Sequence, residues 1–303
     1  MNLTYLLDDT LPTARNHCVL AQADAFVARG MQVRMVTTSD PVQWRRSRAE
    51  WRLVDDLRTA TGDVLVASSP ETARIAYDLA PTHAIQLVFG DPIDLPIPKL
   101  TMTPIVDDAV FRTRIPREHE PQRVLIIGAS QDQTSGVEDG YGAVAHARWF
   151  HQTLDLIRVA PWAPSREEPL DSVQEFHVAL TSTELTRVIH SCDVVIAPLR
   201  REAAVGLEAA MALAAGVPVV ATRIDAHTRF DPKLDFALFA PDDNAVEMGE
   251  KLIDVLMDDG RDDGLRERLR TRGREIAEQF RPEHAAAAAE PFFAACAARL
   301  PVR

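Results

Sequence analysis

Short uncharged runs alternate with amphipathic stretches along the chain. Apolar runs predict strands over residues 3–7, 32–37, 64–67 and 84–88. Between these runs, apolar residues at helical spacing predict helices over 16–29, which ends at Gly30, and over 71–79. Strands that alternate with helices are typical of a parallel sheet covered by helices.

Proline interrupts this rhythm over residues 89–122, a composition typical of irregular chain and of a linker between domains. The alternation then restarts, with strands predicted over 123–127, 156–160, 194–197 and 217–222, and helices over 181–191, 207–215, 245–257, 265–280 and 283–300. The restart predicts an α/β protein of two doubly wound, Rossmann-like domains, residues 1–115 and 116–303. We expect them to face each other across a cleft, because such sheets bind ligands at the carboxyl ends of their strands.

The composition is that of a globular protein. Hydrophobic residues make up 46% of the chain and charged residues 26%, which are ordinary values for a folded domain. No apolar run approaches the roughly 18 residues that a membrane span needs. The start of the chain, MNLTYLLDD, has no basic stretch and reaches Asp8 too early for a signal peptide. We therefore expect a cytoplasmic protein.

Charge and cysteine content exclude further classes. A net charge of −12 provides no basic footprint for nucleic acid, so we expect no nucleic-acid partner. Cys18, Cys192 and Cys296 are far apart and odd in number. They fit neither a disulfide framework nor a zinc site, and we expect them to be small buried hydrophobic residues.

The most informative stretch is CDVVIAPLRREAAVGLEAAMALAAGVPVVATRIDAH, residues 192–227. Its pattern predicts a strand, a polar turn with Arg200, Arg201 and Glu202, a helix that begins near Gly206, and a second strand. Amides at a helix N-terminus bind anions without a metal, and neighbouring arginines neutralise more of the charge. From the residues alone, a diphosphate site and an ordinary strand–turn–helix without a ligand are both open.

The same stretch resembles the donor-binding core of the retaining family 4 glycosyltransferases, which have the GT-B fold. The resemblance rests on Asp193, Pro198, Glu202, Gly206-Leu207, Met211-Ala212 and the GVPVV of residues 216–220. The flanking segments EFHVALTSTELTRVIHSCD, DDNAVEMGEKLIDVLMDD and LRERLRTRGREIAEQF are similar to the family as well. The specific match spans roughly residues 175–282, and weaker similarities place most of the chain within the family's outline.

The resemblance implies transfer of a sugar from a nucleotide diphosphate donor to an acceptor hydroxyl, with retention and without a metal. The nucleotide sugar is a co-substrate, and no other cofactor is implied. Glu202 would contact the transferred sugar. The departing diphosphate would be stabilised by Arg200, Arg201 and the amides of Ala204, Val205, Gly206 and Leu207. Further donor-side or loop positions fall on Gly128, His177 and Thr13, and the last helix would return to the first domain.

The chain departs from the family's pattern in its acidic residues. The family separates its two glutamates by seven residues, whereas Glu202 and Glu208 are separated by five. Counting from Pro198 puts Glu202 in the first position, and counting back from Gly216 puts Met211 in the second. A shifted alignment would instead make Glu208 the acid that binds the ribose.

The chain also lacks family cations. An arginine and a later Lys-Gly follow the first strand of the family's second domain. This chain has Ala129 and then Thr134-Ser135-Gly136. A non-catalytic homologue that acts as a partner or binding subunit is therefore the alternative hypothesis. Another GT-B enzyme, such as a sugar-nucleotide epimerase, is a third.

Three other patterns have a functional and an ordinary interpretation. Adjacent aspartates such as Asp8-Asp9 would offer oxygen ligands, but further ligands do not accompany them and we expect no metal site. His17, His83 and His177 are each a candidate base or an ordinary histidine. Residues 42–58, with Trp44, Trp51 and five arginines, predict a helix that either covers the sheet or makes a peripheral contact with the inner face of a membrane.

Overall fold

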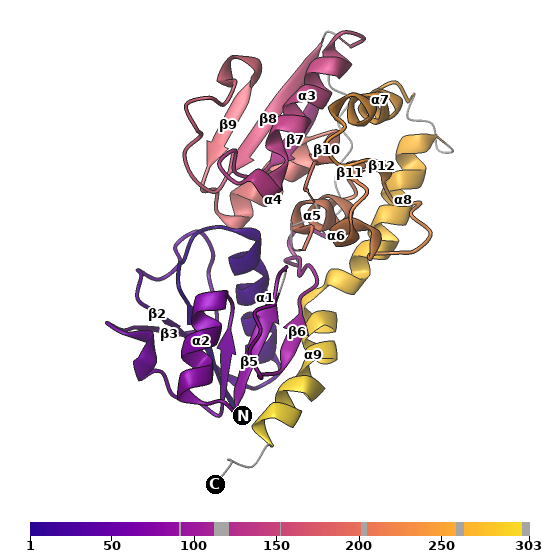
Figure 1. Cartoon of the computed structure of the whole chain (residues 1–303). Coiled ribbons are helices and arrows are strands. Elements are labelled where there is room, and N and C mark those ends of the chain that lie inside the picture. The colour runs from indigo at the N-terminus through magenta and orange to yellow at the C-terminus, as the bar shows by residue number, and fades with distance from the viewer. Residues whose placement is uncertain (91, 112–120, 152, 201–204, 259–263, 299–303) are drawn as a thin grey trace. The chain divides into compact units, whose positions relative to one another are not determined.

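The computed structural model describes residues 1–90, 92–111, 121–151, 153–200, 205–258 and 264–298. The chain divides into two compact units (Figure 1). Unit 1 comprises Met1–Ile105 and Phe280–Arg303, and unit 2 comprises Val106–Gln279. The boundary predicted between residues 115 and 116 lies outside the described residues.

Unit 1 is a six-stranded parallel sheet with helices. Its elements are β1 Asn2–Leu7, α1 Ala14–Ala28, β2 Gln32–Thr37, β3 Glu50–Leu53, β4 Val64–Ala67, α2 Pro70–Leu79, β5 Ala84–Val88, β6 Lys99–Thr101 and α9 Pro282–Ala297. The strand order is β3-β2-β1-β4-β5-β6, which is the order of dinucleotide-binding domains. Central strands β1, β4 and β5 are almost wholly buried because uncharged residues line both faces of a parallel sheet.

The last helix, α9, packs within unit 1 against α1, β4 and β5. The Phe293 ring meets the Phe26 ring of α1 edge to face, with centroids 5.0 Å apart. Arg29, just after α1, forms an ion pair with Glu290. The N-terminal sheet is thus packed against a segment from the far end of the sequence.

Unit 2 repeats the same architecture. Its elements are β7 Gln122–Ile127, α3 Val137–Arg148, β8 Leu154–Ala160, β9 Glu175–Val178, α4 Ser182–Ser191, β10 Val194–Ala197, α5 Leu207–Ala215, β11 Val219–Thr222, α6 Asp225–Thr228, β12 Leu238–Ala240, α7 Ala245–Leu256 and α8 Leu265–Ala277. The order β12-β11-β10-β7-β8-β9 places β7 and β10 side by side in the centre of the sheet. Both units therefore confirm the predicted Rossmann-like fold.

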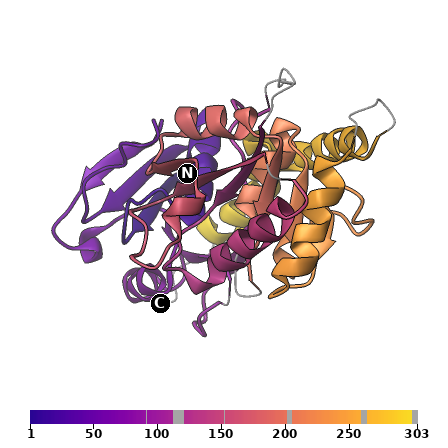
Figure 2. The same ribbon diagram turned by 90° about the horizontal axis from the view of Figure 1, so that it is seen from above.

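Helices α3 and α7 lie side by side on this sheet (Figures 1 and 2). Glycines allow the close approach, since a Cβ at Gly142 would lie 2.7 Å from the Cβ of Ala245 and one at Gly249 would lie 2.9 Å from the Ala143 carbonyl oxygen. The apolar core of the unit includes Ile126 of β7, Ile196 of β10 and Leu252 of α7.

The prediction of a helix over residues 42–58 is wrong. This segment contains β3, which pairs with β2 at the sheet edge, and a short 3-10 turn at Leu57–Thr59. Trp44 is buried, donates its indole N–H to the Thr10 carbonyl at 2.8 Å and packs against the His17 ring. These tertiary contacts outweigh the helical spacing of the two tryptophans.

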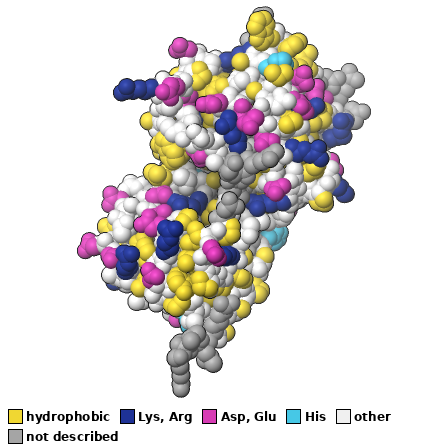
Figure 3. Space-filling view, viewed as in Figure 1, with side chains coloured by type: hydrophobic (Ala, Val, Ile, Leu, Met, Phe, Trp, Pro, Cys, Tyr) yellow, Lys and Arg dark blue, Asp and Glu magenta, His cyan; other side chains and the backbone are white. Residues whose placement is uncertain are grey.

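Within the described ranges, no helix is long and apolar enough to cross a membrane. On the face in Figure 3, acidic and basic side chains are interspersed over both units. The described part of this face therefore does not present the extended basic surface that binds nucleic acid.

Candidate functional site

The chain reverses its direction of winding between β7 and β10 in unit 2. In doubly wound sheets this switch point opens a crevice at the carboxyl ends of the two strands. Here β7 leads into residues 128–136, which we call the β7 loop, and β10 leads into a segment whose described residues, 198–200 and 205–206, we call the β10 turn. The backbone N–H of Arg200 donates to the Thr134 carbonyl at 2.8 Å, so the two segments touch.

The β7 loop is held by its own polar groups. The Ser135 hydroxyl lies 2.6 Å from both the Ala129 and Asp132 carbonyls, and Asp132 accepts from the amide and hydroxyl of Thr134. The loop contains no lysine or arginine. Its polar groups are therefore neutral, apart from the Asp132 carboxylate.

Two glycines permit this geometry. Gly136 has φ of 60°, and a Cβ there would lie 1.8 Å from the Pro198 carbonyl oxygen. Gly206 has φ of 64°, and a Cβ would lie 2.8 Å from the His227 ring. Only glycine satisfies both the positive φ and the close approach. The side-chain position of Gly206 is occupied by residues of α6.

Among the described residues, the N-cap position of α5 provides no side-chain cap. Gly206 occupies the N-cap position without a side-chain hydrogen bond to the first-turn amides. Such amides carry the positive end of the helix dipole and bind anions. Val205, Gly206 and Leu207 are buried, backbone included, so their side chains are not offered to a ligand.

Glu208 lies in the first turn of α5 and is half-buried. Burial raises its pKa to about 7, and the Asp132 carboxylate acts in the same direction, while a backbone amide opposes them. Glu208 therefore gains or loses a proton near neutral pH. This proton affinity distinguishes it from an ordinary first-turn acid.

Arg200 is not a free cation. Its guanidinium lies 3.3 Å from Asp139 of α3 and 3.2 Å from Asp243. The printed contacts involve Nε and Nη2 of Arg200, so a diphosphate would share this guanidinium with the two carboxylates or replace one of them. The other predicted residues of the turn, Arg201, Glu202 and Ala204, lie outside the described residues.

The remaining predicted positions are distributed over both units. Gly128 begins the β7 loop, with φ of 148°. His177 lies on β9, at the sheet edge, 3.3 Å from the Glu175 carboxylate. Thr13 belongs to unit 1, where its hydroxyl accepts the Asn16 amide and caps α1.

The matching switch point of unit 1 lies at the ends of β1 and β4. Arg15 pairs there with Asp8 and Asp9, and the Asn16 side chain donates to Asp9 at 2.7 Å. Burial, with a smaller effect of Arg45, lowers the pKa of His17 to about 3. His17 is therefore neutral at physiological pH. Spacing predicted the aspartates at the strand end, but not the arginine that neutralises them.

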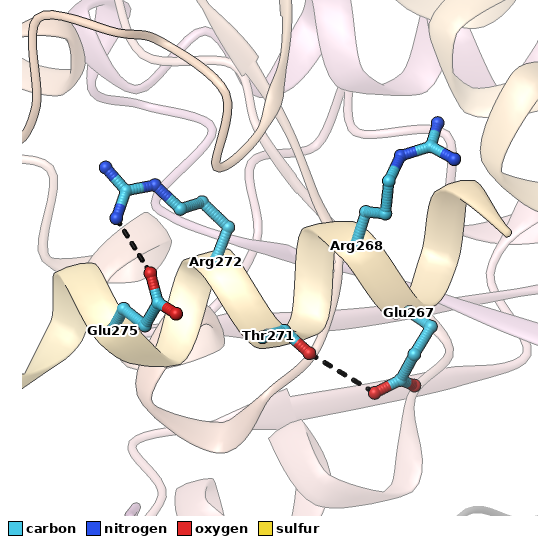
Figure 4. Close-up of a pocket in the computed structure, with 5 residues that line it drawn as sticks. All are labelled: Glu267, Arg268, Thr271, Arg272 and Glu275. Atoms are coloured by element: carbon cyan, nitrogen blue, oxygen red, sulfur yellow. Dashed lines mark hydrogen bonds and ion pairs between the residues drawn. The ribbon is translucent and has the colours of Figure 1, made fainter. Parts of the chain in front are cut away.

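A separate hollow lies on α8 (Figure 4). It is lined by Glu267, Arg268, Thr271, Arg272 and Glu275, whose side chains all come from that one helix. Arg272 is already engaged by Asp231, Asp235 and Glu275. None of the predicted site residues lines this hollow.

Comparison with known proteins matches part of the chain to a family. Residues 117–258 match the family described as "Glycosyl transferases group 1". No curated protein matches the chain in sequence. The matched segment includes the β7 loop, the β10 turn and α5.

Solved structures share the fold of the whole chain. A glycosyltransferase from Rickettsia africae has a TM-score of 0.72 at 9% identity, with 99% of both chains covered. Sucrose-phosphate synthase from Thermosynechococcus elongatus has a TM-score of 0.70 at 14% identity, covering 97% of this chain and 98% of that one. Anabaena HepE, solved with UDP-glucose, has a TM-score of 0.69 at 11% identity, covering 97% and 100%.

At these identities the structures show the fold, and the predicted GT-B architecture is confirmed. The family match adds the class of domain. Residues 117–258 match a group 1 glycosyltransferase domain, and this match indicates an enzyme of the glycosyltransferase kind.

Proposed function

We propose that the chain transfers a sugar from a nucleotide diphosphate donor to an acceptor hydroxyl, and that the donor binds at the β7/β10 switch point of unit 2. One observation carries this proposal. The β7 loop contacts Arg200 at the end of β10 and lies close enough to the first turn of α5 for Asp132 to act on Glu208, inside the segment that matches the glycosyltransferase family.

In this proposal the diphosphate lies against the first-turn amides of α5. The helix dipole stabilises the negative charge that develops as the sugar leaves. Arg200 adds a guanidinium once it exchanges Asp139 or Asp243 for phosphate oxygens. Glu202 contacts the transferred sugar, because it keeps the family's spacing from Pro198.

Retention of configuration and independence of metal are parts of the same proposal. Amides and an arginine take the role that a bound cation has in other nucleotide-sugar sites. The nucleotide sugar is then the only co-substrate besides the acceptor. UDP-linked sugars are the first donors to test, since HepE, a structure of the same fold, was solved with UDP-glucose.

A thermal-shift screen with UDP, GDP, ADP and TDP tests the donor site. A ligand that binds only the folded protein raises its melting temperature by mass action, so we expect one nucleotide to stabilise the chain. Arg200→Ala should reduce that shift. Arg268→Ala, which truncates an exposed arginine on α8, is the matched control and should leave it unchanged.

The alternative of a non-catalytic partner subunit has one specific observation in its favour. The β7 loop contains no cation, and Arg200 is already paired. Turnover decides between the two functions. Release of UDP from UDP-glucose in the presence of a sugar acceptor supports the enzyme, whereas nucleotide binding without release under every acceptor supports the binding subunit.

A further inference from the structure

Arg158 is a fully buried arginine in the centre of β8. Its side chain is 0% exposed, and its neighbours along the strand, Ile157 and Val159, are apolar and buried. Burying a guanidinium is costly unless every charge and donor is compensated. The hydrogen-bond partners of Arg158 therefore show which segments its side chain holds in place.

All five N–H donors of Arg158 are used. Nε and Nη2 donate to Oε1 of Glu168, at 3.0 and 2.8 Å. Nη1 donates to the Ile126 and Val159 carbonyls, and Nη2 also donates to the Gly128 carbonyl at 3.0 Å. The guanidinium thus binds the carboxyl end of β7 from the adjacent strand.

Aromatic side chains complete the environment. The guanidinium lies 5.7 Å from the Tyr141 ring centroid and 5.6 Å from that of Phe176. The Tyr141 hydroxyl donates to Glu168 at 2.8 Å. Burial and this hydrogen bond raise the pKa of Tyr141, so the hydroxyl keeps its proton and remains a donor.

The pair is not arranged for stability alone. Oε2 of Glu168 is buried and accepts no hydrogen bond from the described part of the chain. Apolar side chains of similar volume replace buried ion pairs in many proteins at little or no loss of stability. Arg158 also directs its donors to the Ile126 and Gly128 carbonyls, which lie where β7 ends.

The Gly128 carbonyl lies at the start of the candidate site. Gly128 leads directly into the β7 loop, and Thr134 of that loop accepts the backbone N–H of Arg200. A series of contacts therefore runs from Glu168 through Arg158 and the β7 loop to the β10 turn.

We propose that Arg158, supported by Glu168 and Tyr141, is a positioning residue that fixes the Gly128 end of β7 and so holds the β7 loop in its donor-binding conformation. The loop's role in donor binding rests on the proposed function. The restraint on the loop does not, because it follows from the contacts alone.

The test replaces the pair by apolar residues, as Arg158→Met with Glu168→Leu, and measures amide hydrogen exchange by mass spectrometry. We expect a folded protein in which amides of residues 128–136 exchange about tenfold faster. Exchange in β11 should stay as in the original protein. UDP should bind about tenfold more weakly. Arg148→Met, which removes a half-exposed arginine from α3, is the control and should change neither result.

Unchanged exchange over residues 128–136 in the double variant would overturn the proposal, as would an equal acceleration throughout unit 2, which a purely structural role predicts. If the double variant does not fold, Tyr141→Phe tests the same proposal. Amide exchange over residues 128–136 should again become faster, by a smaller factor than in the double variant. If the original protein binds no nucleotide, the donor site is wrong, and hydrogen exchange still decides the positioning role.

Discussion

Single side chains around the end of β10 determine how a donor would be held. Arg200 is engaged by Asp139 and Asp243, so phosphate would share its guanidinium with two carboxylates or displace one of them. Glu208 shares its surroundings with Asp132, which disfavours a second negative charge there. Binding of an anion at this edge is therefore coupled to the ionisation and pairing of neighbouring side chains.

Glu202→Ala should abolish turnover and leave the fold intact, because we propose that Glu202 contacts the transferred sugar. Glu208→Ala should reduce activity less. Calorimetry with UDP and a turnover assay on both variants measure the difference. If Glu208→Ala loses donor affinity and Glu202→Ala retains full turnover, then Glu208 is the ribose-binding acid and the alignment shifts.

Glu208→Gln should make stability less dependent on pH. The folded protein keeps a proton on Glu208 up to about pH 7, whereas the ordinary pKa is 4.5. The folded state thus binds more protons than the unfolded state in this range, and stability falls as pH rises from about 4.5 to 7. The loss is of the order of 1–3 kcal/mol after allowance for partial exposure. Urea unfolding of the original protein and of Glu208→Gln at pH 5 and pH 8 tests this. The same change in the free energy of unfolding between the two pH values in both proteins would contradict it.

Gly136→Ala should destabilise the protein by about 2–4 kcal/mol, through the positive φ and the clash with Pro198. Gly30→Ala is the matched control. Gly30 also has a positive φ, but a Cβ there would meet nothing within 4 Å, so its cost should be only about 1 kcal/mol. If chemical denaturation shows that both variants lose the same free energy of unfolding, the close approach to Pro198 makes no contribution.

Whole elements show where sequence patterns succeed and where they fail. Uncharged, β-branched runs predicted the strands β4, β5 and β10 with correct ends, because such runs are buried on both faces. The capping box of Thr181 and Glu184 at the start of α4 is also present. Signals of this kind depend only on residues that are close together in the sequence.

Edge elements were missed because their stability comes from distant partners. β3 is a charged strand at the sheet edge that exists through its pairing with β2, and Trp44 is fixed by the Thr10 carbonyl and His17. The pairing of Arg200 and the burial of Arg158 against Glu168 are likewise tertiary. No spacing along the chain encodes them.

Trp44→Ala should therefore lower the free energy of unfolding rather than remove a membrane contact. It removes a buried ring and a hydrogen bond, with an expected loss of about 3–5 kcal/mol. Trp149→Ala is the control, since that residue is 85% exposed and its loss should change stability by less than about 0.5 kcal/mol. Thermal unfolding measures both. A stable Trp44→Ala variant that loses salt-dependent binding to anionic vesicles would restore the membrane interpretation.

For the molecule as a whole, the restart of strand–helix alternation predicted two Rossmann-like sheets, and both have the strand order of that fold. The same topology occurs in both units, but the family match falls on residues 117–258. The proposed donor site is accordingly one place in unit 2, the carboxyl edge of β7 and β10.

Hydrogen exchange with and without saturating UDP tests this donor site, because it reports both that UDP binds and where it binds. We expect slower exchange in the β7 loop and in the first turn of α5, and no change in α8, where Figure 4 shows the separate hollow. Protection confined to other segments, or no protection by UDP, GDP, ADP or TDP at concentrations that saturate a millimolar site, would contradict it.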